Sequence, residues 1–114
     1  MNIDFNLIQA ELKALDNSLD NIIAYFQENL DLNAVLIFKD TPHKITRKHF
    51  HIQDSYLFIL KGGMSLDFTG KVSRLVADDF KFIPKNYYHS SKIDPEDCTY
   101  VIANKNGDFE KIFY

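Results

Sequence analysis

The chain has 114 residues, a formal net charge of -3 and 46% hydrophobic residues, including 10 Phe and 6 Tyr. This length suits one domain, and the composition predicts a folded core rather than a disordered chain. The 13 basic residues are scattered, which argues against nucleic acid as a partner. With a single cysteine, Cys98, no secretory leader pattern at the start and no long apolar run, the sequence predicts a cytoplasmic protein that does not enter a membrane.

The first segment has a helical pattern. Residues 5–30 contain no Gly or Pro, and apolar residues recur there at spacings of three and four, which predicts a helix with one apolar stripe. The run Asp16-Asn17-Ser18 holds poor helix formers that are good N-caps, so two short helices with a joint there are the alternative. We expect the stripe to pack on the domain's own sheet; pairing with a second copy is the other interpretation.

After Leu30 the pattern changes to short segments rich in β-branched and aromatic residues, separated by turn residues such as Gly62-Gly63 and Asn106-Gly107. The predicted strands are residues 34–39, 44–51, 56–61, 64–69, 72–76, 80–83, 99–103 and 109–113. The sequence therefore predicts a mainly β fold, an antiparallel sandwich or barrel. Residues 1–31 would be a helical appendage and residues 32–114 the β-barrel of a single domain.

Three histidines form the pattern most suggestive of chemistry. His49 and His51 are one residue apart in a predicted strand, so both imidazoles are expected on one face. His89 follows a strand that ends at Pro84, and a turn there would direct His89 back toward the sheet. Three neutral imidazoles that meet in this way bind Fe(II), Zn, Ni, Cu or Mn and leave positions open for water or substrate.

Two further residues are candidates for substrate binding. Strand alternation places Arg47 on the face of the two strand histidines, from where it would pair with an anionic group; an ion pair with Asp67 or Asp79 is the alternative. Tyr100, on a late strand, is a candidate hydroxyl donor inside the barrel, and the alternative is a core tyrosine.

The order of these motifs resembles the cupin family. Cupins carry a first motif of His-x-His, three or four residues, Glu and a later Gly, and a second of Gly-Asp, a hydrophobic strand and Pro-x-Gly-x-x-His. Here His49-Phe50-His51 with residues 55–62 looks like the first motif, and residues 78–89 look like the second. The resemblance covers roughly residues 34–113 and implies a cupin-type antiparallel β-barrel or jelly roll. It also implies a metal bound by His49, His51 and His89.

Three positions depart from the family's pattern. The glutamate position falls on Ser55, or on Tyr56 with the longer spacing, and neither residue is a carboxylate. Gln53, in the preceding loop, is another candidate for the fourth position. Asp78 and Asn86 stand where the family has glycine, and both tolerate the backbone of a turn. The implied site is therefore three histidines without an anionic ligand, as in the thiol dioxygenase branch of the cupins.

The resemblance implies a small metalloprotein that binds Fe, Zn, Ni or Mn and acts on a small polar molecule. Dioxygenase-like chemistry is the leading hypothesis, and isomerase-like chemistry is also compatible with a metal-dependent cupin. The alternative is a non-catalytic cupin module that binds a small ligand or a partner protein, in which case the missing glutamate marks lost catalysis. Cupins often pair, so the resemblance also implies a homodimer.

Overall fold

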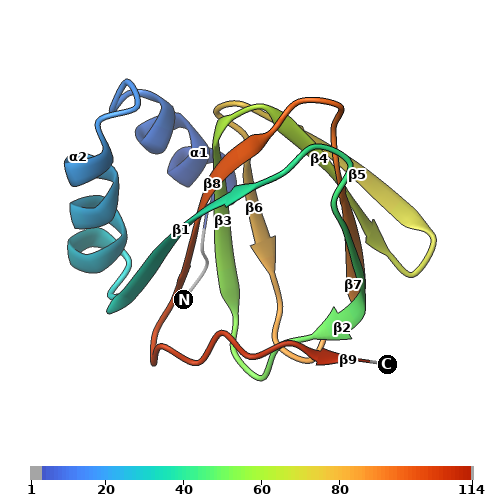
Figure 1. Cartoon of the computed structure of the whole chain (residues 1–114). Coiled ribbons are helices and arrows are strands. Elements are labelled where there is room, and N and C mark those ends of the chain that lie inside the picture. Colours follow the sequence, from blue (N-terminus) through green and yellow to red (C-terminus); the bar gives the residue numbers. More distant parts are fainter. Residues whose placement is uncertain (1–3, 114) are drawn as a thin grey trace.

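Two antiparallel sheets face each other in the computed structural model, which describes residues 4–113, and helices cover the outer face of one sheet (Figure 1). The helical layer consists of α1 (Phe5–Lys13), α2 (Leu19–Ala24) and the π-helical turn η1 (Tyr25–Asn29). The strands among the described residues are β1 (Ala34–Asp40), β2 (Ile45–Phe50), β3 (Ser55–Lys61), β4 (Gly63–Phe68), β5 (Lys71–Val76), β6 (Phe80–Ile83), β7 (His89–Ile93), β8 (Cys98–Asn104) and β9 (Ile112–Phe113). The predicted mainly β fold with an N-terminal helical segment is confirmed.

The strand order is β1-β8-β3-β6 in one sheet and β5-β4-β7-β2-β9 in the other. Strand β3 is buried on both faces because it lies inside a three-layer arrangement of helices and two sheets. Its alternate side chains Tyr56 and Phe58 join the core cluster under the helices. Leu57 and Ile59 point the other way and join the cluster between the sheets. The second cluster forms the inner wall of the barrel.

The helical segment breaks where the sequence offers N-cap residues. Asp16 and Asn17 adopt positive φ angles of 53° and 58°, and Ser18 is the N-cap of α2. The two-helix alternative is therefore confirmed. The apolar stripe packs on the sheet, with Leu12 and Phe26 fully buried. The division at residue 31 stays a prediction. No helix among residues 4–113 is long and apolar enough to cross a bilayer.

Strand β7 lies in a stretch for which the sequence predicts no strand. Its inward positions include His89 and Ser91, which are polar because they line a pocket, so the usual apolar alternation is missing. The last predicted strand, residues 109–113, is a strand only at β9. Both differences concern strands of the sheet that holds the histidines.

Two turn residues that stand where cupins have glycine adopt the positive φ angles that glycine usually adopts. Asp78 and Asn86 adopt φ angles of 74° and 62°, as expected for turn-tolerant residues. Gly62 follows β3 with a φ of 79°, and a Cβ added there would clash with the carbonyl oxygen of Asp97. Only glycine fits that position without a shift of the backbone.

Candidate metal centre

Two of the three histidines lie on neighbouring strands of the second sheet, and the third follows one of these strands. His49 on β2 and His89 on β7 are direct partners in the antiparallel register. His51 follows the end of β2, and its carbonyl accepts a 2.7 Å hydrogen bond from the backbone N–H of Asn86. That bond joins the loop after the first motif to the turn before His89. The two motifs are therefore held together by main-chain contacts, independently of any metal.

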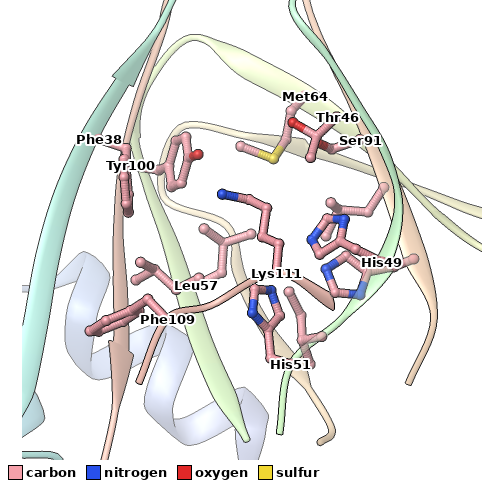
Figure 2. Close-up of a pocket in the computed structure, with 14 residues that line it drawn as sticks. Phe38, Thr46, His49, His51, Leu57, Met64, Ser91, Tyr100, Phe109 and Lys111 are labelled. Carbon is pink, nitrogen blue, oxygen red and sulfur yellow. The ribbon is translucent and has the colours of Figure 1, made fainter. Parts of the chain in front are cut away.

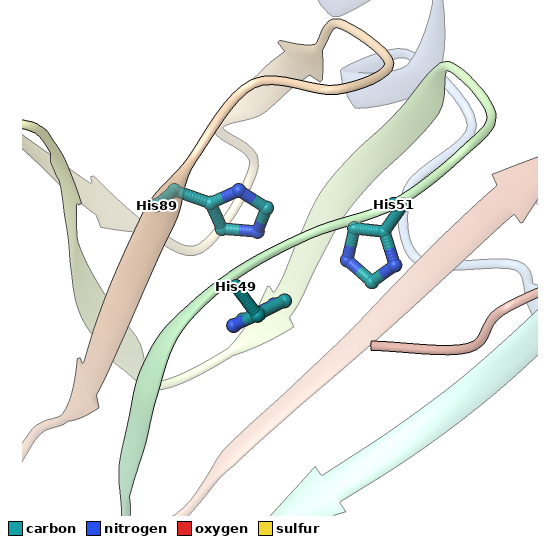
Figure 3. Close-up of side chains that lie close together, drawn as sticks. All are labelled: His49, His51 and His89. Atoms are coloured by element: carbon teal, nitrogen blue, oxygen red, sulfur yellow. The ribbon is translucent and has the colours of Figure 1, made fainter. Parts of the chain in front are cut away.

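The imidazoles of His49, His51 and His89 point toward one another (Figure 3). One ring nitrogen from each lies within 4.8 Å of those from the other two. All three side chains are buried, with exposed fractions of 3%, 6% and 3%. A cluster of three buried nitrogen donors is the donor set of Zn²⁺ and of the other first-row divalent metals.

Each imidazole uses Nδ1 to contact a backbone carbonyl. The acceptors are the carbonyl of Arg47 for His49 at 2.6 Å, that of Glu110 for His51 at 3.0 Å and that of Tyr87 for His89 at 2.9 Å. Because a carbonyl oxygen only accepts hydrogen bonds, Nδ1 carries the proton in all three rings. Each Nε2 is then left with a free lone pair. Metal-binding histidines are oriented by the same type of contact.

Burial lowers the pKa of His49 from 6.5 to about 4, and the nearby His89 and His51 lower it further against the opposing hydrogen bond. Burial is also the main cause of the lowered pKa of His51 and of His89. The three rings are therefore neutral near pH 7. Neutral imidazole is the form that binds metals, so no proton has to leave before an ion enters.

The prediction that Arg47 shares the inward face of the histidines is wrong. Between Thr46 and His49 the register with β7 shifts, because three steps along β2 match two steps from Ser91 to His89. Such a bulge inserts one residue and reverses the alternation of side chains. Thr46 therefore lines the pocket beside the histidines, whereas Arg47 is exposed outside it. The Arg47 guanidinium lies 4.6 Å from the ring centre of Phe113.

A pocket of about 60 Å³ opens beside the histidines, between the two sheets (Figure 2). Tyr100 lines it, as the sequence suggested, and its hydroxyl donates a 2.7 Å hydrogen bond to Asp40. Burial and that hydrogen bond raise the pKa of Tyr100, so the phenol stays protonated. Most of the remaining wall is apolar, with Leu57 and Met64 among its residues. Whether Tyr100 contacts a substrate stays a prediction.

The three candidates for the fourth position lie in different places. Ser55 begins β3, is 2% exposed and shares the inward parity of Leu57. Tyr56 points to the opposite face and stacks edge-on against Phe82, with ring centres 5.1 Å apart. Gln53 accepts a 3.0 Å hydrogen bond from the backbone of Asn106. The structure therefore does not bring Tyr56 or Gln53 to the histidines, and Ser55 is the remaining candidate.

The sequence interpretation missed the C-terminal segment, residues 105–113, as a wall of the pocket. Phe109 and Lys111 both line the cavity. The Glu110 carbonyl accepts the hydrogen bond from His51, and Ile112 pairs with Phe50 of β2. No local pattern points to this arrangement, because it depends on β9 pairing with a strand about sixty residues earlier in the chain.

No family model and no curated protein matches this sequence. Solved structures do match. A cupin-2 domain containing protein from Shewanella frigidimarina has 21% identity and a TM-score of 0.55, over 61% of this chain and 67% of that chain. The polyketide cyclase RemF from Streptomyces resistomycificus has 23% identity and a TM-score of 0.57, over 68% and 55%. The DMSP lyase DddQ from Ruegeria pomeroyi has 18% identity and a TM-score of 0.62, over 70% and 42%.

The matched region spans only about half of each of the two named enzymes. At these identities the matches show the architecture alone. That architecture agrees with the one implied by the motifs at His49, His51 and His89, and the protein has the cupin fold.

Proposed function

We propose that this protein is a metal-dependent cupin that holds a divalent transition metal through Nε2 of His49, His51 and His89 and acts on a small molecule in the adjoining pocket. The observation that carries the proposal is the set of three Nδ1 contacts to backbone carbonyls. A buried histidine gains one hydrogen bond from such a contact and keeps one lone pair. Three lone pairs directed at a common point are what a metal requires.

The residues fit a metal chemically. Held by these three neutral donors, such an ion would supply Lewis-acid or redox chemistry. The chain's own contribution is to fix the three rings, to surround them with apolar walls and to keep the Tyr100 hydroxyl protonated beside the cavity. We keep oxygenase-like chemistry on a small polar molecule as the leading hypothesis for the reaction.

The two matched structures that are named as enzymes suggest other reaction classes for the proposed metal centre. One is a polyketide cyclase and one a DMSP lyase, so a lyase or isomerase reaction on this fold is the second form of the proposal. The rival function is the non-catalytic module that binds a ligand or partner. Assembly as a homodimer and a cytoplasmic location remain predictions.

Metal analysis of protein purified without a histidine tag tests the proposal. We expect one equivalent of Fe, Zn, Ni or Mn per chain, and loss of that equivalent in His49→Ala and in His89→Ala. The matched control is His43→Asn. His43 is an exposed histidine outside the triad with a φ of 62°, which asparagine tolerates.

Equal metal content in the triad variants and the wild type would refute the metal centre. Oxygen uptake by the Fe(II)-loaded protein, measured with a panel of small polar compounds, then separates the reaction classes. Turnover without oxygen uptake would replace the oxygenase hypothesis by a lyase or isomerase reaction. Stoichiometric metal without turnover of any compound would favour the binding module.

A further inference from the structure

We propose that the ligand of this pocket is a small organic anion, a short carboxylate, and that Lys111 is the residue that recognises its charge. The inference rests on the proposed metal centre and adds a substrate class to it. Arg47, the residue that the sequence suggested for this role, lies outside the cavity.

Lys111 reaches into the pocket from the C-terminal segment (Figure 2). The backbone on both sides of it is held in place. The preceding Glu110 carbonyl accepts the hydrogen bond from His51, and the following Ile112 pairs with Phe50 of β2. The same strand pairing places Phe113 opposite His49. The ammonium group is therefore carried by a segment that is fixed directly to two residues of the triad.

The charge of Lys111 has no protein partner among the described residues. None of the residues that line the pocket is Asp or Glu. Lys111 belongs to none of the ion pairs found among residues 4–113, whereas Lys105 of the same segment approaches Asp31 at 3.9 Å. Lys111 as a whole residue is exposed to solvent, so an anion from solvent can reach it.

A metal in the triad would make the binding of an anion in the pocket more favourable. Three neutral imidazoles leave the full double charge of the ion in place, and Lys111 adds a third positive charge beside the same cavity. Like charges near a buried site oppose each other, and a bound carboxylate relieves both. A carboxylate held by Lys111 beside the triad would supply the negative charge that the missing glutamate does not provide.

The pocket also limits the size and character of this anion. A cavity of about 60 Å³ holds roughly four to six water-sized groups. Leu57, Met64 and Ile102 make part of the wall apolar, which favours an organic carboxylate with a short apolar body over inorganic phosphate. The hydroxyls of Thr46 and Ser91 lie in the same lining and offer hydrogen bonds to a polar substituent.

The test compares the wild type with Lys111→Met, which removes the charge and keeps much of the side-chain length, and with Lys105→Met as the matched control. Calorimetry first measures Zn²⁺ binding in a buffer without carboxylate or phosphate. Each zinc-loaded protein is then titrated with propionate, with its neutral amide and with inorganic phosphate. Co²⁺-loaded protein provides a second readout, because its visible absorption responds to a change of ligand at the metal.

We expect Lys111→Met to bind Zn²⁺ more tightly than the wild type in the anion-free buffer, since a like charge has been removed. We expect it to bind propionate roughly ten- to a hundredfold more weakly, the range for loss of one charge-assisted contact. The amide should bind all three proteins equally, and Lys105→Met should behave as the wild type. A general structural defect would not make the same variant bind Zn²⁺ more tightly and propionate more weakly.

The two proposals fail in different ways. If Zn²⁺ does not bind the wild type, both the metal centre and this inference are refuted. If Zn²⁺ binds but propionate affinity is equal in the wild type and Lys111→Met, the role of Lys111 is refuted while the metal centre stands. Binding of phosphate at least as tight as that of propionate would refute the carboxylate as the ligand class.

Discussion

His49 and His89 face each other as register partners across the β2–β7 pair, with ring centres 4.3 Å apart. Two imidazoles on adjacent strands would not need a common tautomer if they only filled a core. Here both direct Nδ1 at a backbone carbonyl two residues earlier in their own strand or turn, and His51 makes the same type of contact with Glu110. The backbone therefore sets the tautomer before any ion arrives.

The first prediction concerns this tautomer. In the metal-free protein at pH 7.5, we expect His49, His51 and His89 to be neutral and protonated at Nδ1. Their ¹⁵N shifts and the couplings from the ring protons should show an unprotonated Nε2 in all three. Addition of Zn²⁺ should move those three Nε2 signals and leave the ring of His43 unchanged. Protonation at Nε2 in any member of the triad would contradict the proposed donor set.

The second prediction concerns the stability of the metal-free protein in acid. Burial lowers the pKa of His49 from 6.5 to about 4, so between these values the unfolded chain binds a proton that the folded chain does not. The free energy of unfolding therefore keeps its full value above pH 6.5. It decreases as the pH falls toward 4, by about 1.4 kcal/mol per pH unit for each such histidine.

Urea unfolding between pH 7.5 and 4.5 measures this slope. His49→Gln should reduce it by about 1.4 kcal/mol per pH unit, because a glutamine does not titrate in either state. His43→Asn, which removes an exposed histidine outside the triad, serves as the control. If all three proteins show equal slopes, His49 is not held neutral by the fold.

The third prediction separates two roles for the helices. Leu12 of α1 is fully buried against the sheet, whereas Leu7 of the same helix is 54% exposed. Leu12→Ala should lower the free energy of unfolding by about 2–5 kcal/mol, because it leaves a cavity in the core. Leu7→Ala should change it by less than about 0.5 kcal/mol. If instead Leu7→Ala converts a dimer to a monomer in light scattering, the exposed side of α1 is a partner surface.

The triad and the fold class could be predicted because the strand alternation at His49 and His51 and the order of the two motifs resemble those of the cupins. Alternation puts His49 and His51 on one face, and a turn after Pro84 delivers His89. The turn residues Asp78 and Asn86 were interpretable for the same reason, since the preference for positive φ belongs to the residue itself.

The errors and omissions have long-range causes. The bulge that turns Arg47 outward exists only in the pairing of β2 with β7, and nothing in the sequence of β2 marks it. Lys111 enters the pocket because β9 pairs with β2, which no local pattern predicts. Strand β7 went unpredicted because its inward positions are polar and serve the cavity instead of a core.

The fourth prediction uses Ser55, where the family's glutamate would stand. Its hydroxyl is a weak neutral ligand, so Ser55→Ala should retain Zn²⁺ affinity within about threefold. Ser55→Glu should lower the melting temperature without Zn²⁺ and increase the rise in melting temperature that Zn²⁺ produces. Ser55 is 2% exposed, so in the metal-free protein a glutamate there is a buried, unpaired charge and should lower the melting temperature.

With Zn²⁺ present, the same glutamate would become an anionic ligand, and the gain in melting temperature on adding metal should exceed that of the wild type. Thermal unfolding with and without Zn²⁺ measures both effects. Ser90→Glu is the control: Ser90 lies next to His89 but on the opposite face of β7, outside the pocket lined by Ser91. Its metal-dependent gain should equal that of the wild type. A smaller gain for Ser55→Glu than for Ser90→Glu would mean that residue 55 is not directed at the triad.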